Sequence, residues 1–162
     1  MGVTGNQGDD TVLHLDDKQL SIWRAFVNAH AAVIERIEKD LSDQRKIPLT
    51  TYDVLVALYQ APERKLRMTE LAKRVVLTRS GLTRVVERLE REGLVTRERT
   101  DDDRRGAFAV LTREGKKSFL ATWPTYAYGI SNYFLSYLDE EERKAIQSGL
   151  TKIYQALQQD RA

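Results

Sequence analysis

The chain of 162 residues contains no cysteine, three prolines and two histidines, His14 and His30. Without cysteine it can form no disulfide framework, no zinc–thiolate site and no thiol redox switch. Two histidines with scattered carboxylates are poor material for a zinc site, so we expect neither a metal nor another cofactor. No stretch of 18 apolar residues occurs in the sequence, and a transmembrane helix is therefore not expected.

The motifs of common catalytic sites are missing as well. The sequence has no phosphate-binding glycine loop, no HExxH pair, no Gly-x-Ser-x-Gly turn and no cysteine nucleophile. A catalytic triad would have to be built from two histidines and scattered acids. We therefore do not expect this chain to be an enzyme.

Hydrophobic residues make up 41% of the chain and charged residues 31%, which suits one apolar core under a charged surface. Residues 1–15 are expected to be a flexible tail. Met1 to Asp10 are rich in Gly, Asn, Gln and Asp and lack the basic start and apolar centre of a secretory signal. Together with the absence of cysteine, this favours the cytoplasm.

Positive charge is concentrated in the middle of the chain. From Arg64 to Lys117 there are 16 Lys and Arg against 9 Asp and Glu, a net charge of +7, whereas the whole chain carries +2 and the remainder therefore −5. A basic middle between acidic flanks suggests a polyanionic partner for the middle alone. Charge by itself leaves a second interpretation equally open, namely an uneven solvated surface.

The residue pattern of 16–47 predicts one long helix that ends before Pro48. Asp16 and Gln19 have the spacing of a capping box at its start. Its inward-facing residues recur in alternating steps of three and four, which predicts one continuous seam. The seam consists of Leu20, Trp23, Val27, His30, Ile34, Ile37 and Leu41.

The segment 113–162 predicts further helices. Thr112 has the position of an N-cap, and Pro124 is expected to kink or break the helix that follows. Asp139 and Glu142 form a second capping box before the last helix. The apolar seam of that helix consists of Ile146, Leu150, Ile153 and Leu157.

Both terminal segments thus carry long apolar faces. Packing them together, and doubling the set with a second copy of the chain, would bury both. The alternative is a bundle within a monomer, but the central domain looks too small to cover both seams. We therefore predict a homodimer joined through the helices of 16–47 and 113–162.

The central segment, 48–112, predicts three short helices, for which Thr50, Thr69 and Thr78 are the expected N-caps. The second and third of them form a helix-turn-helix arrangement.

A hairpin is expected to follow. Gly93 stands where the end of a helix favours a residue that tolerates positive φ. Two strands, 94–99 and 107–111, follow it, and a very short strand is possible at 66–68.

A helix that begins near Thr78 can enter the major groove of DNA, and its N-terminal half usually reaches the bases. Opposite its apolar face, Ser80, Thr83 and Arg84 are expected to point to base edges; the arginine fork can bond two acceptors of guanine at once. Thr69 and Thr78 are expected to hold phosphates at helix starts. The simpler interpretation of these positions is solvated surface.

The tip of the hairpin carries Asp103 and Arg105. Acidic residues are out of place beside phosphate unless they orient arginines. We therefore expect Asp103 to brace Arg105 and direct it at a narrow minor groove. The alternative is an ordinary charged loop.

Several stretches of the chain resemble the signature of the MarR family of bacterial winged helix-turn-helix regulators. They are Met68–Ala72, Thr78–Thr83, Leu89–Arg97, Asp103–Gly106 and Leu111–Gly115. The resemblance is strong over 48–115 and extends to the flanking helices in pattern only. It implies a mainly α fold with a small β-hairpin wing, in a homodimer that binds a palindromic double-stranded DNA operator. It also implies repression of a neighbouring gene that a small molecule relieves.

The resemblance assigns roles to single residues as well. Its recognition-helix positions fall on Arg79, Ser80, Thr83, Arg84 and Arg88, and its wing pair falls on Asp103 and Arg105. Members that sense peroxides use a cysteine, which this chain lacks. Phenolic or aromatic carboxylic effectors bind in the family where the dimerisation helices meet the winged domain. The residues that could line such a crevice here are Trp23, Phe26, His30, Tyr52, Tyr126 and Tyr128, although residues of these types are more often core residues, and His30 on the seam favours a packed or hydrogen-bonded histidine.

A competing function is a helical protein-interaction module whose basic surface binds an acidic protein without operator specificity. Such a module would not need Gly93, the paired strands and the Asp-x-Arg tip in this order. The sequence therefore favours a DNA-binding transcriptional regulator, expected to be a repressor that a small aromatic or phenolic effector releases.

Overall fold

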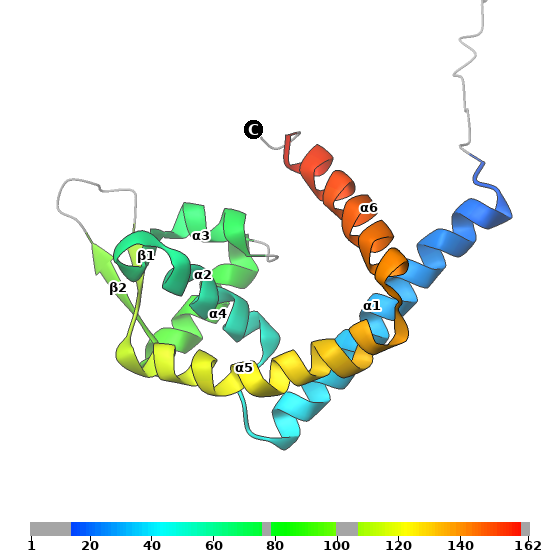
Figure 1. Cartoon of the computed structure of the whole chain (residues 1–162). Coiled ribbons are helices and arrows are strands. Elements are labelled where there is room, and N and C mark those ends of the chain that lie inside the picture. Colours follow the sequence, from blue (N-terminus) through cyan, green and yellow to red (C-terminus); the bar gives the residue numbers. More distant parts are fainter. Residues whose placement is uncertain (1–13, 76–78, 100–106, 160–162) are drawn as a thin grey trace, which may run out of the picture. The chain divides into compact units, whose positions relative to one another are not determined.

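A computed structural model of the chain describes residues 14–75, 79–99 and 107–159. Figure 1 shows a mainly helical chain with one small sheet, which confirms the predicted fold class. The elements are α1 (Asp17–Asp43), α2 (Leu49–Gln60), β1 (Lys65–Arg67), α3 (Met68–Arg74), α4 (Arg79–Arg91), β2 (Val95–Arg99), β3 (Ala107–Leu111), α5 (Arg113–Tyr133) and α6 (Glu140–Gln159). Within these ranges, no helix combines the length and the apolar character needed to cross a bilayer.

The chain divides into two units, Met1–Ala32 and Val33–Ala162. The first unit contains the beginning of α1, and the second contains the rest of α1 with every later element. Large side chains stand exposed on the part of α1 in the first unit. They are Ile22, Trp23, Phe26 and Val27.

The main core of the second unit forms where α2, α3, α4 and the sheet meet. Its fully buried members include Val54, Leu55, Leu58, Leu71, Leu82, Val86, Leu89 and Val95. Each buried aliphatic side chain of this size contributes about 1.5–3 kcal/mol relative to an exposed one. Phe119 brings the first half of α5 into the same core. This packing fixes the helix-turn-helix to the wing.

The sheet is antiparallel, with strand order β1-β3-β2. Arg97 lies opposite Ala109 in the β2–β3 pair. The very short strand expected at 66–68 exists one residue earlier, at Lys65–Arg67, and pairs with β3. The wing is therefore a three-stranded sheet rather than a bare hairpin.

A smaller cluster joins the second half of α1 to α2 and α5. Ile37, Leu41 and Leu49 are buried there, with Ile130 packed against them. A hydrogen bond from the Tyr133 hydroxyl to Asp40, 2.6 Å long, ties the same two long helices.

Both predicted capping boxes are confirmed. The amide of Asp16 donates to Gln19 Oε1 at 2.9 Å, and the amide of Gln19 donates to Asp16 Oδ1 at 2.7 Å. The backbone amides of Asp139 and Glu142 make the equivalent pair of bonds at 2.9 and 2.8 Å. Thr112 caps α5 as expected, since its Oγ1 accepts from the amide of Gly115 at 3.0 Å.

The expected N-caps of α2 and α3 are wrong. Thr50 lies inside α2, which begins at Leu49, and the amide of Leu49 donates to Glu38 Oε1 of α1 at 2.9 Å. A carboxylate from another helix thus replaces the local cap and also suits the positive end of the helix dipole. Thr69 lies inside α3, which begins at Met68 directly where β1 ends. The third expected cap, Thr78, lies outside the described residues.

Of the kink or break expected at Pro124, the break is wrong, because α5 continues through this residue as one helix (Figure 1). A proline leaves the carbonyl four residues earlier without its usual donor. That residue is Leu120, and both Leu120 and Pro124 are exposed, so water can solvate the carbonyl.

We expect Gly115→Ala to destabilise the protein by about 1–3 kcal/mol, as overpacking generally does. A Cβ at Gly115 would lie 2.1 Å from the backbone oxygen of Leu94, which cannot move without disturbing the wing. The matched control is Gly149→Ala in α6, whose Cβ would meet nothing within 4 Å and which should stabilise by about 0.5–1 kcal/mol. Urea unfolding would measure both, and equal stability of the two variants would contradict the close approach of α5 to the wing.

Candidate nucleic-acid interface

Helix α4 is amphipathic, and its apolar face is buried in the main core. Leu82, Val86 and Leu89 are at most 1% exposed. Because residues three and four apart share a face of a helix, the positions between them turn outward. Arg84 is among these, and it is exposed without an ion pair to any described residue.

The junction between α4 and β2 has a defined geometry. Gly93 has a φ of +72°, which confirms its expected role. The amide of Leu94 donates to the carbonyl of Leu89 at 2.9 Å, and the amide of Gly93 to the carbonyl of Glu90 at 3.1 Å. These two bonds form a Schellman motif, which ends the helix and sets the direction of the following strand. The Thr112 hydroxyl donates to the Gly93 carbonyl at 2.8 Å and closes the base of the wing.

Arg97 of β2 connects the wing to α4. Its Nε lies 3.4 Å from a carboxylate oxygen of Glu90, and its Nη2 lies 3.8 Å from Glu87. The same two nitrogens are buried and lack a hydrogen-bond partner within the described part of the chain. Arg97 is not among the site residues predicted from the sequence. Two glutamates three positions apart on a helix, followed by an arginine on a strand, were the available signal.

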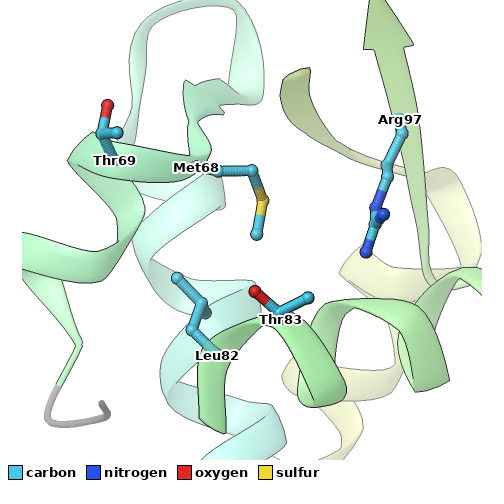
Figure 2. Close-up of a pocket in the computed structure, with 5 residues that line it drawn as sticks. All are labelled: Met68, Thr69, Leu82, Thr83 and Arg97. Carbon is cyan, nitrogen blue, oxygen red and sulfur yellow. The ribbon is translucent and has the colours of Figure 1, made fainter. Parts of the chain in front are cut away.

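An open cavity of about 250 Å³ lies beside this connection, between the start of α3, the first turns of α4 and β2. Figure 2 shows Met68 and Arg97 converging on it from opposite sides. Its lining residues are Met68, Thr69, Leu82, Thr83 and Arg97. Thr69 and Thr83, both predicted to contact DNA, thus line the same cavity.

Arg88 is held differently from Arg84, although both are on α4. Its Nη2 donates to Thr51 Oγ1 of α2 at 2.7 Å, and its Nε lies 3.8 Å from Glu92 Oε1. Thr51 is 1% exposed. The guanidinium of Arg88 is therefore engaged with the protein itself.

The other predicted DNA contacts divide into two groups. Ser80 is exposed in the first turn of α4, and Arg79 is the first residue of that helix. Asp103 and Arg105, like Thr78, lie outside the described residues.

Two of the predicted effector-crevice residues meet in the second unit. The rings of Tyr52 and Tyr126 are edge to face, with centroids 5.1 Å apart. Burial raises the pKa of Asp53, and the charge of Glu38 raises it further. Burial likewise raises the pKa of Tyr126, to which Asp53 and Glu38 also contribute. The structure thus joins α1, α2 and α5 at a partly buried acidic and aromatic cluster.

The remaining candidates for the effector crevice do not take part in this cluster. Trp23, Phe26 and His30 are in the first unit and lie along one face of α1, with successive ring centroids 6.0 and 6.3 Å apart. All three are exposed. Tyr128 is exposed on α5, and its ring lies 6.4 Å from that of Tyr133.

Comparison with known proteins relates the chain to one family. Residues 46–106 match the model of the MarR family. A crystal structure of a MarR family transcriptional regulator from Streptomyces coelicolor in complex with DNA is similar over 93% of this chain and 94% of that chain, with a TM-score of 0.83 and 33% identity.

Two proteins of Bacillus subtilis are similar in sequence. An uncharacterised HTH-type transcriptional regulator is 28% identical over 130 residues, which are 80% of this chain and 82% of that protein. An HTH-type transcriptional repressor is 34% identical over 91 residues, which are 56% of this chain and 54% of that protein.

We expect Asp53→Asn to stabilise the protein at about pH 7.5 and to have little effect near pH 4. Because the folded-state pKa of Asp53 is raised, the wild type loses stability as pH rises from the ordinary value of 3.8 through the folded pKa. Asparagine cannot ionise and avoids this loss. Melting temperatures across this range would measure the difference. A melting-temperature difference between Asp53→Asn and the wild type that does not change with pH would contradict the assignment.

Proposed function

We infer that this chain, which belongs to the MarR family of transcriptional regulators, is a homodimeric repressor that binds a palindromic operator. A small aromatic or phenolic effector, on binding, causes the protein to dissociate from that operator. That it is a DNA-binding transcriptional regulator, and not an enzyme, follows from the family. We propose in addition that it forms a homodimer, recognises a palindromic operator, represses transcription and responds to an effector.

The observation that carries the proposal is the outward face of α4. Its apolar face is buried, and Ser80, Thr83 and Arg84 lie in the N-terminal half, which is the half that reaches base edges in helix-turn-helix proteins. We assign Arg84 to a guanine, and Ser80 and Thr83 to bases or phosphates. Thr69, Thr78 and Arg79 are proposed to contact the DNA backbone near the starts of α3 and α4.

The wing supplies the second contact in this proposal. Asp103 orients Arg105, and Arg105 enters the neighbouring minor groove. Contacts of this kind add affinity on many sequences, whereas base contacts from α4 select among them. Repression is supported by the relative from Bacillus subtilis that is named a repressor.

Exposed apolar faces support the homodimer. On α6, Ile153 and Leu157 are 58% and 60% exposed, and on α1 Trp23 is 61% exposed. Soluble monomers rarely leave large contiguous apolar faces in water. We propose that a second copy covers the helices of 16–47 and 113–162, and that an effector binds near Tyr52 and Tyr126, with Trp23, Phe26 and His30 as further candidates.

We expect Arg84→Ala to weaken binding to the preferred duplex by about 1–3 kcal/mol and to relax its sequence preference, because one bidentate base contact is lost. Fluorescence anisotropy with a duplex selected by the protein from a random library, and with an unselected duplex, would measure both effects. Arg105→Ala should instead weaken binding to both duplexes. Lys144→Ala on α6 removes the same charge and should leave both affinities unchanged. Equal loss from Arg84→Ala and Lys144→Ala would refute the base contact.

Salt dependence separates this function from a protein-interaction module. An operator-binding protein should lose affinity steeply as salt rises, because each phosphate contact releases counterions, and should still prefer the selected duplex. Binding that shows neither property would favour the module.

We expect Ile153→Lys to convert the protein to a monomer and to reduce operator affinity, because it places a charge in the proposed apolar interface. Gln155→Lys introduces the same residue at an exposed neighbouring position of α6 and serves as the control. Sedimentation velocity at micromolar concentration would give the masses. A wild type that sediments as a monomer would rule out the dimer without touching the DNA-binding assignment.

A further inference from the structure

We propose that Arg88 is a positioning residue that locks the recognition helix α4 to α2 through Thr51, and that it makes no direct contact with DNA. The inference rests on the proposed function of α4 as the helix that enters the major groove. It reverses the role that the family resemblance gives to Arg88.

The geometry of the bond carries the inference. Arg88 Nη2 and Thr51 Oγ1 are 2.7 Å apart, which is short for an N–H···O bond. The acceptor is almost completely buried, at 1% exposure, and belongs to a helix whose neighbouring residues Val54 and Leu55 are fully buried. To reach a phosphate or a base, Arg88 would have to leave this hydroxyl behind in the protein interior without its donor, which is costly.

The guanidinium makes a second contact within the protein. Arg88 Nε faces Glu92 Oε1 at 3.8 Å, one turn further along α4. A carboxylate beside the arginine reduces the positive charge it can present to a phosphate. The side chain is therefore engaged at two of its nitrogens with groups of the protein.

The position of Arg88 along the helix agrees with this role. It lies in the C-terminal half of α4, which begins at Arg79 and ends at Arg91, whereas base contacts usually come from the N-terminal half. Arg84, one turn earlier, is exposed and forms no ion pair within the described ranges. The two arginines thus have different roles. Arg84 faces outward, and Arg88 fixes the rotation of α4 about its own axis.

Helix α2 is a suitable anchor because it is itself bonded to α1 at its first residue and packed against α5 through Tyr52. Its first amide is bonded to Glu38 of α1 at 2.9 Å, and Tyr52 packs edge to face on Tyr126 and Phe119 of α5. A helix bonded to α2 therefore takes its orientation from the body of the second unit.

A double-mutant cycle with Thr51→Val, Arg88→Met and the combined variant tests the proposal. Binding to a duplex selected by the wild type from a random library is measured by anisotropy over a range of salt concentrations, at a temperature where circular dichroism shows every variant folded. We expect each single variant to lose about fivefold to tenfold in affinity, the loss of about one such hydrogen bond. The combined variant should be no weaker than Arg88→Met, because both changes break the same bond.

The salt dependence distinguishes positioning from contact. Arg88→Met should leave the slope of log affinity against log salt unchanged, because it removes no phosphate contact. A residue that contacts a phosphate would reduce that slope by about 0.9. Thr51→Ser, which keeps the hydroxyl, should bind close to wild type. A purely structural role would lower the melting temperature without changing affinity.

Several results would overturn the inference. They are additive losses, a slope reduced by about 0.9 in Arg88→Met, and unchanged affinity in both single variants. If Thr51→Val does not fold, Arg88→Met and Arg88→Gln alone decide through the slope. A wild type that binds no duplex would defeat the proposed function together with this inference, whereas binding with additive losses would defeat this inference alone.

Discussion

The burial of one face of α4 is the constraint on which the rest of the structure depends. Leu82, Val86 and Leu89 enter a core shared by α2, α3 and the sheet, and each is almost fully removed from water. The helix cannot rotate without exposing them, so its polar face is presented to solvent in one orientation. A groove-reading helix needs this, because base contacts are specific only when the side chains approach at a fixed angle.

Around that buried face, polar contacts refine the orientation. The Schellman motif at Gly93 sets where the wing leaves α4, and Arg97 joins the wing to Glu87 and Glu90 of the same helix. Both contacts lack hydrogen-bond geometry, and although the guanidinium nitrogens are buried the two carboxylates are about half exposed, so the pairs contribute little to stability. They instead help to set the position of strand β2 relative to helix α4.

Sequence reasoning predicted what is encoded within a few residues. The capping boxes at Asp16 and Asp139 are confirmed because each is closed by a residue three positions away. The positive φ of Gly93 is equally local, and its prediction is confirmed.

What sequence reasoning missed depends on tertiary contacts. The amide of Leu49 is bonded to a residue 11 positions earlier, and Arg88 to one 37 positions earlier, and no periodic pattern contains these pairs. The break predicted at Pro124 does not occur, because the tolerance of a helix for proline depends on which of its sides faces water. The predicted DNA contacts remain predictions, since their test requires DNA.

The capping of α2 by Glu38 has a consequence for protein engineering. A designer who transplants residues 48–112 onto another scaffold would take the reading module without the carboxylate that satisfies its opening amide. The graft would begin with an unpaired donor at a buried residue, Leu49, and with an N-terminal dipole that no negative charge compensates. The smallest portable module of this chain therefore includes the last two turns of α1, or a substitute acid supplied by the host.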